Sequence, residues 1–400
     1  MTTPDTTARR TLVACAALMV GALTLTACGS DAKADNKAGG SKSGAGIVIS
    51  AKDGSAGASI NSTGVKVGDG KLTEVKMTES ETGEAVPGAI SGNGKSWKPE
   101  ERLERGTKYR ISATARSGSG KTSAADSTFT TVSEDNSFIG TYTPDGGAKV
   151  GVGMPVSFTF DKAITNKKDI ESHIEVSSSS GQKVVGHWFG AQRLDFRPKE
   201  YWKAGSKVTT KVDLDGVEGA NGVYGVQDKT VTFTVGRSQV STVDMDTQTM
   251  KVVRDGATVK TIPISGGSPD NSTYNGQMVI AEKFRQTRMD GSTVGYGGEY
   301  DIADVPNAMR LTASGTFIHG NYWYDKSNPP FGKQGTSHGC VGLADVQGAG
   351  SDTNGKWFFD NSLVGDVVTV RNSPDKTVSP DNGLNGWNMA WSAWTAGSAL

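Results

Sequence analysis

Apolar and polar residues alternate with a period of two along several stretches of the chain, which is typical of β-strands with one buried face. In residues 109–115 one side of the strand carries Tyr109, Ile111, Ala113 and Ala115, and in residues 208–214 it carries Val208, Thr210, Val212 and Leu214. A closing strand follows each stretch, around Phe129 in the first and across residues 231–235 in the second. The pattern predicts a mainly β protein.

The two stretches belong to an internal repeat with an offset of 99 residues. Trp97-Lys98-Pro99-Glu100 recurs as Phe196-Arg197-Pro198-Lys199, and Arg105-Gly106-Thr107-Lys108-Tyr109 recurs as Ala204-Gly205-Ser206-Lys207-Val208. A unit of about 100 residues built from such strands fits an immunoglobulin-like sandwich. We therefore predict two tandem Ig-like domains, over residues 46–133 and 134–236, without the disulfide of the antibody type.

A third domain is predicted over residues 237–373. Asp255-Gly256 separates two strand-like stretches and is a strong hairpin signal. A strand near residues 316–318 runs into His319, and residues 367–370 form a last strand. In the tail, residues 374–400, Trp387, Trp391 and Trp394 have helical spacing. This spacing predicts one face of a helix that packs on the body of the protein.

The N-terminus has the layout of an export signal. Arg9-Arg10 precedes an uncharged apolar run that ends in Leu25-Thr26-Ala27-Cys28, which resembles a lipobox. We predict a lipoprotein signal peptide over residues 1–27, acylation of Cys28, and a flexible Gly- and Ser-rich tether over residues 28–45. A single anchor helix is the alternative. Either arrangement places the protein outside the cytoplasm, held at the membrane.

Composition narrows the choice of partners and cofactors. Lys and Arg number 42 and Asp and Glu number 42, so no basic field favours nucleic acid. No His-Glu-x-x-His motif is present, and His173 and His187 have no acidic or cysteine cluster beside them in the sequence. We therefore expect no metal and no cofactor.

The candidate chemistry lies at Cys340. Cys15 falls in the export segment and Cys28 in the lipobox, so Cys340 keeps a free thiol. A neighbouring base activates such a thiol, and His338 and His319 are both candidates. In an extended segment His338 and Cys340 would share a face, and the amides of Gly339 and Cys340 would be oxyanion donors. A live thiol of this kind is expected to outreact free cysteine at pH 7.

The order of residues excludes several cysteine enzymes. Papain-like and NlpC-like peptidases need a histidine after the nucleophile, and none follows Cys340. Sortases need a downstream arginine in a matching context, and the sequence around Cys340 is not sortase-like.

His319-Gly320-Asn321 followed by Ser337-His338-Gly339-Cys340-Val341 resembles the signature of the L,D-transpeptidases, and the similarity covers the whole mature chain. The resemblance implies a β-sandwich catalytic domain of the YkuD type. Cys340 would be the nucleophile, His319 the general base and acid, and the Gly320 carbonyl would orient the imidazole. Substrate-binding and oxyanion roles would fall to Ser337, His338, Gly339, Asn321 and Trp323, and residues 323–335 would form a lid. Gly342 stands where many members carry Arg or Asn, and Ala313 stands where some relatives place a Tyr near the oxyanion.

The resemblance also implies an activity. Cys340 would form a thioester with a peptidoglycan tetrapeptide stem, release the terminal D-alanine and pass the acyl group to a neighbouring stem, giving a 3→3 cross-link. Hydrolysis would be a carboxypeptidase side reaction, and carbapenems would acylate the thiol. Two alternatives stay open: a degenerate domain that only binds the wall as a spacer, and the same enzyme with a protein or a D-amino acid as acceptor.

Overall fold

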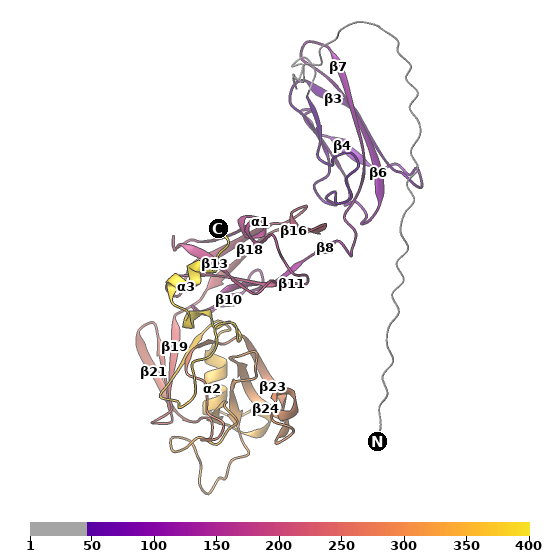
Figure 1. The fold of residues 1–400 in the computed structure, drawn as a ribbon. Coiled ribbons are helices and arrows are strands. Elements are labelled where there is room, and N and C mark those ends of the chain that lie inside the picture. The colour runs from indigo at the N-terminus through magenta and orange to yellow at the C-terminus, as the bar shows by residue number, and fades with distance from the viewer. Residues whose placement is uncertain (1–45) are drawn as a thin grey trace, which may run out of the picture. The chain divides into compact units, whose positions relative to one another are not determined.

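The computed structural model describes residues 46–400, which form three successive β-rich regions (Figure 1). The signal peptide, the acylation site Cys28 and the tether predicted for residues 1–45 lie outside the described residues. The predicted fold class is confirmed: the chain is mainly β, with Ig-like sandwiches before the third domain and a small helical tail. Within residues 46–400 no helix combines the length and apolarity needed to span a bilayer.

The first region is a sandwich of two sheets. One sheet has the order β1 (Ile47–Ile49), β2 (Val65–Val67), β5 (Ser96–Pro99) and β4 (Gly88–Ile90), and the other the order β3 (Lys71–Glu79), β6 (Lys108–Arg116) and β7 (Thr122–Thr130). The predicted alternation holds in β6, where Tyr109, Ile111, Ala113 and Ala115 are buried. Their faces pack with Trp97 and Phe129 in one core.

The second region repeats this plan. One sheet has the order β13 (Val184–Phe189), β14 (Arg193–Pro198), β11 (Val156–Phe160) and β9 (Gly140–Thr143), and the other the order β10 (Lys149–Val150), β18 (Asp228–Val235), β15 (Lys207–Asp213) and β12 (Ile174–Ser178). A small third sheet joins β16 (Glu218–Ala220), β17 (Val223–Gly225) and β8 (Ser137–Phe138), and α1 spans Lys167–Ser172. Trp97 on β5 and Phe196 on β14, matched by the repeat, are both buried.

The third region is built on a nine-stranded sheet. Its strands, in spatial order, are β22 (Gly276–Val279), β27 (Val367–Arg371), β19 (Gln239–Asp244), β20 (Thr249–Arg254), β21 (Ala257–Ser265), β26 (Val341–Ala344), β25 (Phe317–Asn321), β24 (Asp301–Arg310) and β23 (Glu282–Asp290). The short helical segments are η1 (Gly291–Val294), η2 (Gln347–Ala349) and α2 (Asn354–Asn361). The Asp255-Gly256 hairpin has positive φ at both residues, as its tight turn requires.

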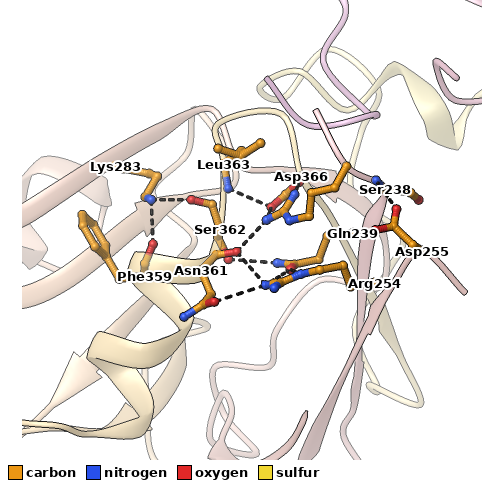
Figure 2. Close-up of polar contacts among 11 residues, drawn as sticks. Ser238, Gln239, Arg254, Asp255, Lys283, Phe359, Asn361, Ser362, Leu363 and Asp366 are labelled. Atoms are coloured by element: carbon orange, nitrogen blue, oxygen red, sulfur yellow. Dashed lines mark hydrogen bonds and ion pairs between the residues drawn. The ribbon is translucent and has the colours of Figure 1, made fainter. Parts of the chain in front are cut away.

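Polar contacts at the C-terminal end of α2 fix the entry of the chain into this region (Figure 2). Lys283 Nζ donates to the carbonyls of Phe359 and Ser362, and Arg254 donates to the Asn361 carbonyl. Arg237, at the start of the region, forms a bidentate ion pair with the buried Asp366. Helix C-termini leave carbonyls without partners and favour cations, so these side chains complete the helix end.

The C-terminal tail differs from the prediction of one helix that carries three tryptophans. Trp387 lies in the 3-10 turn η3 (Gly386–Asn388), and α3 (Trp391–Ala396) begins only after the extended Met389 and the N-cap residue Ala390. A contact with a distant strand holds this break: the Asn388 side chain accepts from the Gln277 amide and donates to the Gln277 carbonyl, which ties η3 to β22. The Arg197 guanidinium of β14 lies over the rings of Trp387, Trp391 and Trp394, at 4.6, 5.3 and 4.2 Å from their centroids.

The tail packs on the second region. Trp394 is fully buried, stacks on His187 with ring centroids 4.8 Å apart, and donates through Nε1 to the Val185 carbonyl. Trp387 donates through Nε1 to the Gly153 carbonyl, 2.7 Å away. The end of the tail donates to Glu171 from Ser398 and from the amide of Ala399. The chain therefore returns from the third region to the second.

Candidate active site

Two neighbouring parallel strands bring the thiol and the histidine together. β25 pairs with β26 in the register Ile318↔Val341 and His319↔Gly342. Cys340 directly precedes β26, and its Sγ accepts a hydrogen bond from the Phe317 amide at 3.4 Å. His319 is two residues beyond Phe317, so its side chain leaves the strand on the same face. The strand pairing thus closes the 21-residue gap between His319 and Cys340.

His319 and Cys340 line a cavity of about 460 Å³. The segment predicted as a lid supplies one wall, through Trp323, Tyr324, Asp325, Asn328, Pro330 and Gln334. A second wall comes from the hairpin β23–β24, through Met289, Tyr300 and Ile302. The sequence analysis did not predict this wall. Tyr296 and Tyr300 in the glycine-rich turn could have indicated it, because tyrosines in such a turn are not expected to pack in a core.

His319 is held as a neutral base. Its Nδ1 lies 2.9 Å from the Gly320 carbonyl oxygen, which can only accept, so Nδ1 carries the proton and Nε2 is left free. Burial lowers the His319 pKa, and the Gly320 contact and the charge of Asp345 oppose that effect. Trp323, 41% exposed, stacks on the imidazole with ring centroids 5.6 Å apart. The site therefore favours unprotonated imidazole at neutral pH.

The surroundings of Cys340 favour the protonated thiol. It is a free, buried cysteine, and burial raises its pKa to about 11, while the hydrogen bond from Phe317 acts in the opposite direction. Burial thus acts against the expectation that the thiol outreacts free cysteine at pH 7, because it opposes the thiolate more than the Phe317 hydrogen bond favours it. Attack by sulfur requires a base that removes the proton during the reaction.

His338 does not serve as that base. Its Nε2 lies 2.9 Å from Glu299 Oε2, and its ring lies between Tyr296 and Tyr300 at centroid distances of 5.0 and 4.9 Å. The expected shared face with Cys340 is wrong because Gly339 has φ +100°, which interrupts the extended backbone. His338 joins the hairpin wall to the Cys340 segment, since the Tyr296 hydroxyl also donates to its carbonyl.

The other predicted site residues shape the same pocket. Ser337 donates through Oγ to the Cys340 carbonyl at 2.6 Å, which stabilises the turn that carries the thiol. Asn321 is buried and accepts from the Trp323 amide. Gly342 lines the cavity beside Asn321, whereas Ala313 is exposed and is not among the lining residues. In residues 46–400 no group of three His, Cys, Asp or Glu side chains could hold a metal ion.

Comparisons with known proteins match both parts of the chain. Residues 57–218 match the bacterial Ig domain, and residues 238–370 match the L,D-transpeptidase catalytic domain. L,D-transpeptidase 2 of Mycobacterium tuberculosis is 30% identical over 357 residues, which cover 88% of this chain and 85% of the relative. L,D-transpeptidase 5 of the same organism is 30% identical, over 84% of this chain and 73% of the relative.

A solved structure is similar to part of this chain. L,D-transpeptidase 3 of M. tuberculosis, in complex with a faropenem-derived adduct, is 25% identical with a TM-score of 0.46, over 58% of this chain and 97% of that one. The identity and coverage of the mycobacterial relative, together with the matched domains, establish that this chain belongs to the L,D-transpeptidases, a family of cysteine-dependent acyltransferases.

Proposed function

We propose that this protein is a peptidoglycan L,D-transpeptidase that works through an acyl-enzyme on Cys340. The observation that carries the proposal is the pairing of a buried thiol with a neutral, oriented imidazole in one cavity. A domain that only binds the wall has no need of this pair, so the geometry favours the enzyme over the spacer alternative.

The reaction follows from the protonation states. His319 Nε2 takes the proton from Sγ while the sulfur attacks the carbonyl between the third residue of a tetrapeptide stem and its terminal D-alanine. The tetrahedral intermediate collapses to a thioester, and His319 returns the proton to the amine of the leaving D-alanine. The side-chain amine of a neighbouring stem then attacks the thioester, loses its proton to His319 and restores the thiol. The product is a 3→3 cross-link.

Competition by water decides the side reaction. If water attacks the thioester, the product is a free tripeptide, and the enzyme acts as an L,D-carboxypeptidase. The two walls of the cavity would limit the access of water once both stems are bound. A free D-amino acid or a protein amine would follow the same second step, and these acceptors are outcomes of the experiment below.

A strained β-lactam carbonyl is a natural probe of the same thiol. Carbapenems open at this carbonyl to give an acyl-enzyme on Cys340 without loss of a leaving group. We expect imipenem to add its full mass to the protein at Cys340.

The location of the enzyme is a separate proposal. We infer from Leu25-Thr26-Ala27-Cys28 that the protein is acylated at Cys28 and held outside the cytoplasm, at the membrane and facing the wall. Metabolic labelling with a fatty acid in wild type and Cys28→Ala tests it. Equal labelling of both would contradict it.

The experiment that tests the function is intact-protein mass spectrometry after incubation with a disaccharide-tetrapeptide, for wild type and Cys340→Ala. A wild-type adduct that lacks the terminal D-alanine, with a cross-linked dimer, both absent in the variant, supports the proposal. If imipenem acylates Cys340 but no stem adduct forms, the donor assignment is wrong. If neither reagent acylates Cys340, the spacer alternative replaces the enzyme.

A further inference from the structure

Asp345 is a buried carboxylate that the mechanism above does not use. It directly follows β26, and only 5% of its surface is exposed. Three neutral donors from separate segments hold its oxygens: Asn307 Nδ2 at 2.8 Å, Thr353 Oγ1 at 2.7 Å and its neighbour's amide, Val346 N, at 2.8 Å. None of the ion pairs of residues 46–400 includes it. Because these donors are neutral, no cation cancels the charge of the carboxylate, and its field acts on neighbouring groups.

The carboxylate packs directly behind the residue that orients His319. A methyl group at Gly320 would lie 2.2 Å from Asp345 Oδ2, and one at Gly355 would lie 2.1 Å from the same oxygen. The Asp345 amide also donates to the Asn321 carbonyl at 3.0 Å. Glycine is therefore required at position 320 because Asp345 fills the space that a side chain would occupy. The Gly320 carbonyl that accepts from His319 belongs to this tightly packed peptide.

Charges around the imidazole are few. Besides His319, the titratable side chains that line its cavity are Tyr300, Tyr324, Asp325, His338 and Cys340. On the far side of Gly320, Asp345 shares a surface pocket with Lys260 and Asp352, and Arg285 reaches it through Asn307. Asp345 is the carboxylate whose charge acts on His319, in the direction that favours imidazolium.

We propose that Asp345 is a positioning residue for the cysteine–histidine pair: from behind Gly320 it fixes the carbonyl that orients His319, and its charge stabilises the imidazolium formed when His319 takes the thiol proton. The inference rests on the proposed function only for the direction of proton transfer. It gives the pair a third member that acts through a peptide group rather than by direct contact with the imidazole.

The test compares wild type with Asp345→Asn, which keeps the shape and removes the charge. Two quantities are measured against pH: the rate constant for acylation by imipenem, and the ring chemical shifts of His319 by NMR. Loss of the anion destabilises imidazolium, so the His319 pKa falls and the acidic limb of the rate profile moves to lower pH. The plateau rate falls by roughly tenfold, the effect of about 1.4 kcal/mol on the barrier.

Two further variants separate charge from packing. Thr353→Val removes one donor to Asp345 without changing any charge, and we expect its acidic limb to coincide with that of wild type. The double variant Asp345→Asn/Asn307→Asp exchanges the carboxylate and the amide across their hydrogen bond. We expect it to move the acidic limb of the rate profile part of the way back toward that of wild type. If Asp345→Asn does not fold, this double variant still carries the charge test.

The outcomes are distinct from those of the functional test. The proposal is overturned if Asp345→Asn folds and leaves both the His319 titration and the imipenem profile unchanged, or if Thr353→Val shifts the limb as much as Asp345→Asn does. The NMR titration needs no substrate, so it reports on Asp345 even if no cross-linked stem is ever formed.

Discussion

Removal of the Trp394 side chain should destabilise the second Ig-like domain rather than the catalytic domain, although Trp394 lies beyond the catalytic domain in the sequence. The side chain is fully buried, stacks on His187 and donates to the Val185 carbonyl. Truncation of a buried tryptophan to alanine costs about 3–5 kcal/mol, and the lost contact with Arg197 is part of that figure.

Trp391→Ala is the matched control. Trp391 faces the same guanidinium at 5.3 Å but is only half-buried, so its removal deletes a cation–π contact and little buried surface. We expect a cost of about 1 kcal/mol or less. For a domain of about 100 residues, 1 kcal/mol shifts Tm by about 4–8 °C, so the two variants should differ by about 10 °C or more.

Calorimetry of the multidomain protein gives the Tm values, and hydrogen exchange assigns them to a domain, because a chain with several domains need not unfold in one step. Amides of β13 should exchange faster in Trp394→Ala, and those of β20 should be unchanged. Equal destabilisation by both variants, or protected β13 amides in Trp394→Ala, would show that the tail is not seated as described.

Three further predictions concern the site. Because burial raises the Cys340 pKa to about 11, iodoacetamide should alkylate it more slowly than free cysteine at pH 7, and the rate should rise about tenfold per pH unit up to pH 10; a flat profile would contradict a protonated resting thiol. Folding lowers the His319 pKa, so the contribution of His319 to stability is complete above pH 6.5 and is lost as the pH falls below that value. The free energy of unfolding, measured with urea at several pH values, should therefore fall more steeply with decreasing pH for wild type than for His319→Gln. Equal slopes for the two proteins would count against a buried neutral imidazole. Gly320→Ala places a methyl group 2.2 Å from Asp345 and should lower the acylation rate about 100-fold. In the control Gly342→Ala the methyl group lies 3.3 Å from the Ser265 carbonyl oxygen, and the acylation rate should stay within about tenfold of wild type. Similar losses in both variants would refute the packing argument.

Local pattern was enough to predict the sandwiches. The alternation in residues 109–115 and 208–214 reports burial of one strand face, and the 99-residue repeat places Trp97 and Phe196 at matching core positions. The hairpin at Asp255-Gly256 was also predictable from local sequence, because its turn depends on the positive φ values of two adjacent residues.

The failures come from contacts between distant segments. The three tryptophans have helical spacing, but the helix is interrupted at Asn388, whose side chain bonds to Gln277, 111 residues earlier, and no local period reports this contact. The reactivity of the thiol was predicted from the histidine near it in the sequence, whereas burial, which sequence distance does not report, raises its pKa. Tyr300 and Asp345 were missed because strand pairing, not sequence distance, brings them to the Cys340–His319 pair.

The close packing of Gly320, Asp345 and Gly355 has a consequence for descent. A chain that acquires a side chain at position 320 or 355 while aspartate stands at 345 meets a carboxylate oxygen within about 2 Å. Such a substitution is accommodated only where position 345 carries a smaller side chain, and a return to aspartate then requires glycine again at the substituted position. The three positions, spread over 36 residues, should therefore vary together among relatives.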